Sequence, residues 1–218
     1  MNEREIELRA GGNLLAGTLG MLNGNARGLI VFAHGSGSGR RSPRNRFVAG
    51  SLNEAGFATL LLDLLTADEE RIDDRSGELR FDIGLLARRM VDATEWARNQ
   101  SELGRLPIGY FGASTGAAAA LVAASTRKDV AAVVSRGGRP DLAGGALDSV
   151  TAPVLLIVGS RDPVVLNVNR IAASRLRDSE LAIVPGATHL FEEPGTLEEV
   201  TALARRFFAT HLPVSGAP

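Results

Sequence analysis

The 218-residue sequence contains no cysteine, which excludes disulfide bonds, a thiol nucleophile and thiolate metal sites. An excess of one charge is also lacking: 25 acidic residues against 24 Lys and Arg leave a net charge of −1, so we expect neither nucleic acid nor an anionic membrane as a partner. The longest apolar run, residues 117–124, is far shorter than the ~20 residues of a bilayer span. The charged N-terminus lacks the apolar core of a signal peptide. These absences favour a cytoplasmic protein that acts on a small molecule, and they leave its oligomeric state open.

The hydrophobic pattern runs from end to end, and the length suits a single domain, residues 1–218. Two apolar segments flank the turn Gly11-Gly12-Asn13, a pattern that predicts an antiparallel hairpin. Unalternating apolar runs follow, as in parallel strands buried on both faces, at residues 28–33, 58–62, 108–111, 130–134, 153–158 and 181–184. Helical patterns lie between these runs, so the sequence predicts an α/β protein with a doubly wound, mostly parallel sheet.

Two helices and one loop are predicted in more detail. After Arg80, apolar residues recur every three or four positions as far as Ala97, which indicates an amphipathic helix. Thr196 and Glu199 form a capping-box pattern that predicts the start of the last helix. Residues 64–80 have mixed charge and no periodicity, so we expect a loop there that borders the site at the carboxyl ends of the strands.

The pentapeptide GASTG at residues 112–116 stands between the apolar run that ends at Phe111 and an alanine-rich helix pattern. A serine on a sharp turn from strand to helix forms a nucleophile elbow, which needs small residues on both sides because strand and helix nearly touch there. Gly112 and Gly116 meet this need, so Ser114 is the predicted nucleophile. The short pattern also fits a glycine-flanked helix N-cap, so the prediction needs support from elsewhere in the chain.

A serine nucleophile needs an adjacent base. The chain has three histidines. His211 ends the last helix pattern, where solvation or the helix dipole explains it, and His34 belongs to a glycine-rich loop. His189 follows the last predicted strand at the carboxyl edge of the sheet and is the predicted general base.

The base in turn needs an orienting acid. Asp162 follows an earlier strand, and the chain order Ser, Asp, His is typical of α/β-hydrolases. Its position before Pro163 also suits a helix N-cap, and the two roles are compatible. Weaker candidates for the acid are Asp141, Glu192 and Glu193.

An attacked acyl group also needs donors that stabilise its oxyanion. The Thr115 backbone N–H is one predicted donor. The loop HGSGSG at residues 34–39 follows a buried strand, and its glycines allow backbone to approach a substrate closely. We predict the Ser36 N–H as the second donor, with Gly35 as the alternative.

The same loop admits a rival interpretation, a dinucleotide-binding turn with Asp63 as the ribose-binding acid. Arg40 stands where the third glycine of G-x-G-x-x-G belongs, which favours the hydrolase. The sequence has neither a P-loop nor an H-E-x-x-H metal pair, so we expect no cofactor and no metal.

With GASTG, HGSGSG, Asp162 and His189, the whole chain resembles a small α/β-hydrolase of the dienelactone hydrolase-like group. The resemblance implies a three-layer fold with an eight-stranded, mostly parallel sheet, an antiparallel N-terminal hairpin and no large cap. It also implies hydrolysis of esters or lactones without a cofactor, with Ser114 as nucleophile, Asp162 as acid and His189 as base. Dienelactone hydrolases proper carry a cysteine nucleophile, so this chain is more similar to their serine-bearing relatives, some of which are fused to phosphoribosyltransferase-like domains.

We therefore predict a serine hydrolase that acts on a small ester, thioester or lactone through an acyl-enzyme. A non-catalytic small-molecule-binding module on the same fold is one alternative, against which the complete Ser, Asp and His set argues. A peptidase or transacylase with the same triad is another, because the pocket and not the triad selects the acceptor.

Arginine is the last informative feature, because Lys128 is the only lysine. Arginines follow the glycine loop at positions 40, 41, 44 and 46, and Arg136 and Arg139 follow the run at 130–134. Arg136 or Arg139 is predicted to favour anionic substrates by pairing a carboxylate or phosphate. Since arginine replaces lysine throughout, a solvated surface or a structural ion pair is the competing interpretation for each arginine.

Overall fold

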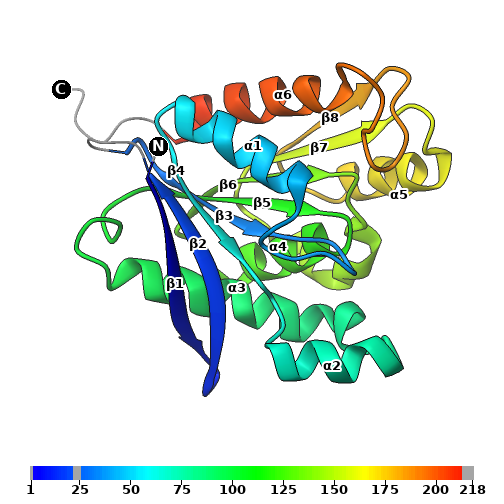
Figure 1. Ribbon diagram of the computed structural model, residues 1–218. Coiled ribbons are helices and arrows are strands. Elements are labelled where there is room, and N and C mark those ends of the chain that lie inside the picture. The colour runs from blue at the N-terminus through cyan, green and yellow to red at the C-terminus, as the bar shows by residue number, and fades with distance from the viewer. Residues whose placement is uncertain (1, 22–25, 213–218) are drawn as a thin grey trace.

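The computed structural model describes residues 2–21 and 26–212, which form an eight-stranded sheet in the order β1-β2-β4-β3-β5-β6-β7-β8 (Figure 1). The strands are β1 (Asn2–Ala10), β2 (Asn13–Met21), β3 (Leu29–Ala33), β4 (Ala58–Leu62), β5 (Ile108–Ala113), β6 (Val130–Arg136), β7 (Val154–Gly159) and β8 (Ser179–Val184). Strands β3 to β8 run parallel to one another, and β2 is antiparallel to both β1 and β4. The predicted architecture is confirmed.

The hairpin of β1 and β2 follows from its turn. Gly11 and Gly12 both adopt positive φ, 54° and 87°, which a two-residue hairpin turn requires and glycine tolerates. Across the strands Leu8 pairs with Leu15, and both side chains are buried. Strand β2 then pairs with β4, so the hairpin extends the parallel sheet.

Helices cover both faces of the sheet (Figure 1). Helices α1 (Pro43–Glu54) and α6 (Thr196–His211) pack on one face, and α3 (Ile83–Arg98), α4 (Thr115–Thr126) and α5 (Pro163–Ala173) on the other. Because both faces are covered, every residue of β3, β4, β5 and β7 is buried. Within the described ranges, every helix is too short or too polar to cross a bilayer.

The loop predicted at residues 64–80 is wrong, because this segment contains helix α2 (Ala67–Ser76) and the 3₁₀ turn η1 (Leu79–Phe81). Thr66 and Glu69 form a complete capping box at the start of α2, and Gly77 ends the helix with φ 69°. Only Asp73 is buried within α2, so the helix has no apolar face to reveal its period.

The capping box predicted for the last helix is also wrong. The N-cap of α6 is Gly195, which has no side chain to cap the helix. The Thr196 hydroxyl instead donates to the Glu193 carbonyl oxygen at 2.7 Å. The helix itself is present as predicted, and its Val200 and Ala204 are fully buried.

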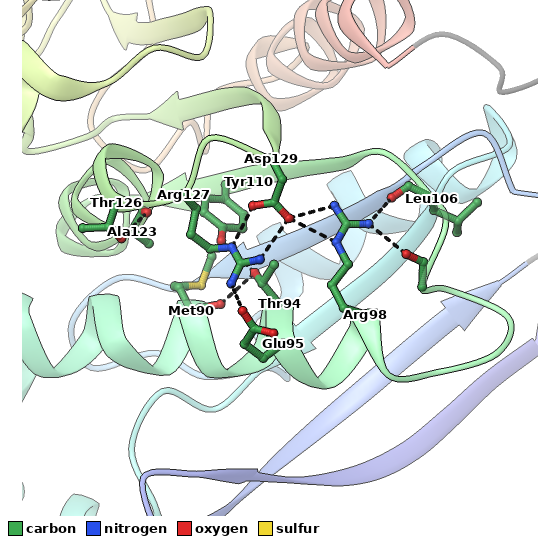
Figure 2. Close-up of polar contacts among 11 residues, drawn as sticks. Met90, Thr94, Glu95, Arg98, Leu106, Tyr110, Ala123, Thr126, Arg127 and Asp129 are labelled. Atoms are coloured by element: carbon green, nitrogen blue, oxygen red, sulfur yellow. Dashed lines mark hydrogen bonds and ion pairs between the residues drawn. The ribbon is translucent and has the colours of Figure 1, made fainter.

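An ion-pair cluster fixes the amino-terminal end of β6 (Figure 2). Arg127 donates to both carboxylate oxygens of Asp129 at 2.9 Å and also to Glu95. Arg98 donates to the same Asp129 at 3.0 and 3.1 Å. The hydrogen bonds from Arg127, with those from Arg98, lower the pKa of Asp129 to about 2.

Candidate active site

Ser114 lies on the turn between β5 and α4 with φ 51° and ψ −121°. Positive φ outside glycine costs roughly 1–3 kcal/mol and persists only where the surroundings enforce it. Here the Ser114 N–H donates to the Arg136 carbonyl oxygen at 3.2 Å, and the Ser114 carbonyl accepts from the N–H groups of Ala117 and Arg139 at 3.1 Å. The strand, turn and helix that GASTG predicts are therefore present, with the serine at the carboxyl edge of the sheet.

Close contacts explain the glycines on either side of Ser114. A Cβ on Gly112 would lie 2.4 Å from the Ala117 Cα, and a Cβ on Gly116 would lie 2.3 Å from the Ala33 carbonyl oxygen. Neither position accepts a side chain unless the backbone moves. The Ser114 side chain makes no cap hydrogen bond to α4, so the interpretation of Ser114 as a simple N-cap fails.

His189 and Asp162 meet at the same edge, each from the loop after a strand. His189 Nδ1 lies 2.7 Å from Asp162 Oδ2. A carboxylate only accepts, so the ring hydrogen lies on Nδ1 and Nε2 keeps the lone pair that a general base needs. The other oxygen, Asp162 Oδ1, accepts the Val165 N–H at 3.4 Å and caps α5. Asp162 thus caps a helix and holds the His189 ring at once.

The weaker candidates for the acid all have other partners. Asp141 pairs with Arg139. Glu192 pairs with Arg44 at 3.1 Å, and Glu193 accepts the Thr188 N–H at 3.1 Å. The geometry therefore favours Asp162 over these three.

Residues 136–139 connect Ser114 to the His189 loop. The Arg136 carbonyl accepts the Ser114 N–H, and a Cβ on Gly137 would lie 3.6 Å from His189 Cε1. Over residues 2–21 and 26–212 the Ser114 hydroxyl has no hydrogen-bond partner, so its bond to His189 is not made in this structure. Catalytic hydrogen bonds are often long without substrate and tighten in the complex.

The HGSGSG loop packs directly on the elbow. Gly35 comes so close that its Cβ would lie 3.0 Å from the Ser114 Cβ. The Ser36 N–H donates to Thr115 Oγ1 at 2.9 Å. Thr115 is the first residue of α4, where backbone N–H groups have no intrahelical acceptor. Both predicted oxyanion donors therefore lie beside the elbow, but the Ser36 N–H is already bound to a side chain, which the sequence did not indicate.

His34 has a structural role in this loop. The residue is 8% exposed, its Nε2 accepts the Leu64 N–H at 3.0 Å, and its Nδ1 donates to the Gly35 carbonyl oxygen at 2.9 Å. Burial lowers the pKa of His34, which keeps the ring neutral. These bonds tie the loop after β3 to the loop after β4 and fix the start of the HGSGSG segment.

Arg136 and Arg139 have different surroundings. The Arg139 guanidinium makes two parallel bonds to Asp141, at 2.9 and 2.6 Å, which raise its pKa. Arg136 is 6% exposed, donates from Nη2 to Asn45 Oδ1 at 3.1 Å, and lies 5.9 Å above the Phe191 ring. It pairs with none of the described carboxylates, and its Nε has no hydrogen-bond partner. Burial, with the nearby charge of Arg44, lowers the pKa of Arg136 to about 10.

Three arginines after the glycine loop form ion pairs, as the competing interpretation expects. Arg40 pairs with Asp63 and Glu5, and its backbone N–H also donates to Asp63 at 2.7 Å. Arg44 pairs with Glu192 and Arg46 pairs with Glu3, each at 3.1 Å. The acid of the rival dinucleotide interpretation, Asp63, is thus occupied.

A cavity of about 740 Å³ lies beside the glycine loop. Its walls include Ser36, Thr115 and, from the segment at 64–80, Leu65 and Glu70. Burial, with the charges of Asp63 and Asp74, raises the pKa of Glu70. The segment thus lines the same cavity as the two residues predicted to give oxyanion donors, although as a helix, while Ser114, Asp162 and His189 are not among the residues that line it. In the part of the chain that the structure describes, no three His, Asp or Glu side chains gather into a metal-holding group.

The sheet order and a serine on a strained turn after β5 define an α/β-hydrolase fold. More narrowly, the chain belongs to the dienelactone hydrolase family, whose model matches residues 18–210. It is similar to the crystal structure of a dienelactone hydrolase from Anabaena variabilis, with a TM-score of 0.94 and 53% identity over 96% of this chain and 98% of that one. This family agrees with the predicted enzyme class, the hydrolases of carboxylic esters.

Two proteins of Mycobacterium tuberculosis, each named "Putative phosphoribosyl transferase", are 56% identical to this chain over 214 residues. These matches cover 97% of the chain and 47% of each relative, so the chain spans about half the length of the curated relatives it matches. Est1E from Butyrivibrio proteoclasticus shares the fold at 18% identity, with a TM-score of 0.79 over 95% of this chain and 98% of that one.

Proposed function

We propose that this chain hydrolyses a small ester, thioester or lactone through an acyl-enzyme on Ser114. The observation that carries the proposal is the bond of 2.7 Å between His189 and Asp162, at the edge where Ser114 is held at positive φ. The connection between β6 and β7 contains only the short segment η2 (Pro140–Ser149). This connection forms no large cap over the site, which suits a small substrate.

In the proposed reaction the Ser114 oxygen attacks the acyl carbon while His189 Nε2 takes the hydroxyl proton. The Thr115 N–H donates to the oxyanion, and the Ser36 N–H, the second predicted donor, is bound to Thr115 Oγ1 in the free protein. When the intermediate collapses, His189 gives the proton to the leaving group. Water, deprotonated by His189, then attacks the acyl carbon, and His189 returns the proton to the Ser114 oxygen as the acyl–oxygen bond breaks, which releases the acid and free Ser114.

Labelling with a fluorophosphonate tests this proposal without the natural substrate. We expect one label per chain at Ser114, lost in Ser114→Ala and reduced at least about a hundredfold in rate in His189→Ala, because the serine then lacks its base. His211→Ala is the matched control, since that ring lies tilted against Phe207 at the end of α6, and it should label at the wild-type rate. Absence of labelling in folded protein would support the binding module instead.

The peptidase and transacylase alternatives are separated by a second assay. Hydrolysis of p-nitrophenyl butyrate is followed with and without added alcohols or amines as acceptors, and a peptide library is tested in parallel. The proposal expects the free acid as the main product and no peptide cleavage. Accumulation of the acyl-transfer product would favour the transacylase.

We further propose that Arg136, and not Arg139, makes the site prefer substrates that carry a carboxylate. The support is that Arg136 is buried next to the Ser114 and His189 loops and pairs with no acid among the described residues, whereas Asp141 already neutralises Arg139. A buried cation without an anionic partner is unfavourable in the free protein, and an anionic substrate would supply the missing charge.

The matched pair Arg136→Gln and Arg139→Gln tests this preference. The substrates are p-nitrophenyl butyrate and the p-nitrophenyl monoester of succinic acid, which differ by a terminal carboxylate. A charged hydrogen bond contributes ~1.5–3 kcal/mol, so Arg136→Gln should lower kcat/KM for the succinate ester by about tenfold or more relative to the butyrate ester. Arg139→Gln should leave that ratio unchanged, and equal ratios in both variants would contradict the proposal.

A further inference from the structure

The Thr115 hydroxyl is a buried polar group that the proposed reaction does not yet use. The residue is 3% exposed, and its hydroxyl oxygen accepts the Ser36 N–H at 2.9 Å. A hydroxyl has one hydrogen to donate in addition to the bonds that it accepts. Throughout the described ranges, the Thr115 hydroxyl donates its hydrogen to no acceptor.

The other buried threonines of the structure show how unusual this is. Thr94 donates to the Met90 carbonyl oxygen at 2.9 Å, and Thr201 donates to the Leu197 carbonyl oxygen at 2.7 Å. Thr59 and Thr196 likewise donate, to Asn53 Oδ1 and to the Glu193 carbonyl oxygen. Buried donors are normally paired, so an unused hydrogen at this one threonine indicates an acceptor that arrives with a ligand.

The position of Thr115 indicates what that acceptor is. Thr115 directly follows the proposed nucleophile, and it lines the cavity of about 740 Å³ together with Gly35 and Ser36. As the first residue of α4 it has no carbonyl one helical turn earlier within the helix to receive its hydrogen. Its hydroxyl and its backbone N–H belong to one residue, so both can reach a single oxygen beside Ser114.

We propose that the Thr115 hydroxyl is a catalytic donor of the oxyanion hole; this inference rests on the proposed function. The Thr115 N–H and O–H donate together to the oxyanion that forms on the acyl group of Ser114. The Ser36 N–H acts at one remove: it donates to Thr115 Oγ1, fixes the rotamer of the side chain and polarises its O–H bond. No proton is transferred to or from Thr115 in this role.

A competing arrangement makes the opposite prediction. If the hydroxyl only blocks the Ser36 N–H until the side chain rotates away, then removing it frees that N–H for the oxyanion and raises the rate. The two arrangements therefore differ in the sign of the effect on kcat.

Thr115→Val keeps the branched shape and removes the hydroxyl, while Thr115→Ser keeps the hydroxyl. Thr201→Val is the matched control, because this buried threonine lies on α6 and gives its hydrogen to a carbonyl. With p-nitrophenyl butyrate, loss of one oxyanion donor should lower kcat of Thr115→Val by about 10²-fold or more with little change in KM. Thr115→Ser should stay within about fivefold of wild type and Thr201→Val within about twofold, since neither loses that donor.

A kcat of Thr115→Val equal to or above the wild-type value would overturn the inference, as would a Thr115→Ser variant as slow as Thr115→Val. A second measurement needs no variant: the crystal structure of the wild-type protein with a phosphonate on Ser114. We expect Thr115 Oγ1 within hydrogen-bond distance, about 2.6–3.2 Å, of the phosphonyl oxygen. If Ser114 does not react, the proposed function itself fails; if it reacts and Thr115 Oγ1 points elsewhere, only this inference fails.

Discussion

Strand β6 separates two arginines with opposite surroundings. Arg127 stands just before the strand and is held by Asp129 and Glu95, and these hydrogen bonds raise its pKa (Figure 2). Arg136 ends the strand, pairs with none of the described carboxylates, and has its pKa lowered to about 10 by burial. The arginine before the strand is thus paired with acids, whereas the arginine at its carboxyl end lacks an anionic partner among the described residues.

The difference separates stability from function. At the amino-terminal end of β6, the charges of Arg98, Arg127 and Asp129 are paired with one another within the chain. The carboxyl edge combines Ser114 at positive φ, the unpaired cation of Arg136 and the unused hydrogen of Thr115. Each of these features is unfavourable in the free protein, and such features concentrate at functional sites.

The largest expected difference is in kcat, when an aspartate is replaced by asparagine at the carboxyl edge of the sheet or at the amino-terminal end of β6. Asp162→Asn removes the acceptor that selects the His189 tautomer, so kcat should fall by about 10⁴-fold while the asparagine still caps α5. Asp129→Asn should leave kcat within about twofold, because the ion-pair cluster has no part in the proposed reaction. Steady-state rates with p-nitrophenyl butyrate measure both. Comparable losses of kcat in the two variants would remove the distinction between the edges.

The second comparison concerns stability, where replacing the two arginines should change the free energy of unfolding in opposite directions. Arg136→Met replaces a buried, unpaired cation by an apolar side chain of similar length, so the free energy of unfolding should rise by about 1 kcal/mol. Arg127→Met removes the arginine bonded to Glu95 and leaves Asp129 with its bonds to Arg98, so it should lower the free energy of unfolding by about 1 kcal/mol, since both acids are partly exposed to solvent. Denaturant unfolding of both variants measures these changes. A loss of stability in both would mean that the Arg136 contacts with Asn45 and Phe191 outweigh its burial.

The smallest effect is the pH dependence of the amino edge. The pKa of Asp129 in the folded protein, about 2, lies below its usual value of 3.8. Its contribution to stability is therefore complete above about pH 4 and disappears as the pH falls through about 2. The side chain is 40% exposed, so this contribution should not exceed about 1 kcal/mol. The melting temperatures of wild type and Asp129→Asn should converge between pH 4 and 2, and parallel curves would argue against an ionised Asp129 as the source.

The fold was predictable because its strands are continuous apolar runs between turn signals. Strand β4 has the bounds of its apolar run, and α3 has the predicted apolar period. Helix α2 was missed because its burial is confined to Asp73, so capping by Thr66 and Glu69 defines it instead of periodicity. A capping pattern is ambiguous in sequence, as Thr196 shows, because the hydroxyl can bond backward to Glu193.

Single residues of the site could be predicted from the sequence, but their contacts and burial could not. Motifs and their order in the chain predict Ser114, Asp162 and His189, and the roles of these residues stay predictions. The contact between Asp162 and His189 supports them. Spacing treats Arg136 and Arg139 alike, since what separates them is Asp141 on one and burial on the other. The bond from Ser36 to Thr115 joins residues 79 positions apart, so local sequence gives no sign of it.

The fixed ring of His34 has a use in spectroscopy. Two hydrogen bonds of opposite direction hold this imidazole in the tautomer with hydrogen on Nδ1. Burial lowers its pKa, so its nitrogen resonances should stay constant over the pH range in which exposed histidines titrate. The protein thus contains its own internal standard, against which the signals of His189 can be followed as substrates or inhibitors are added.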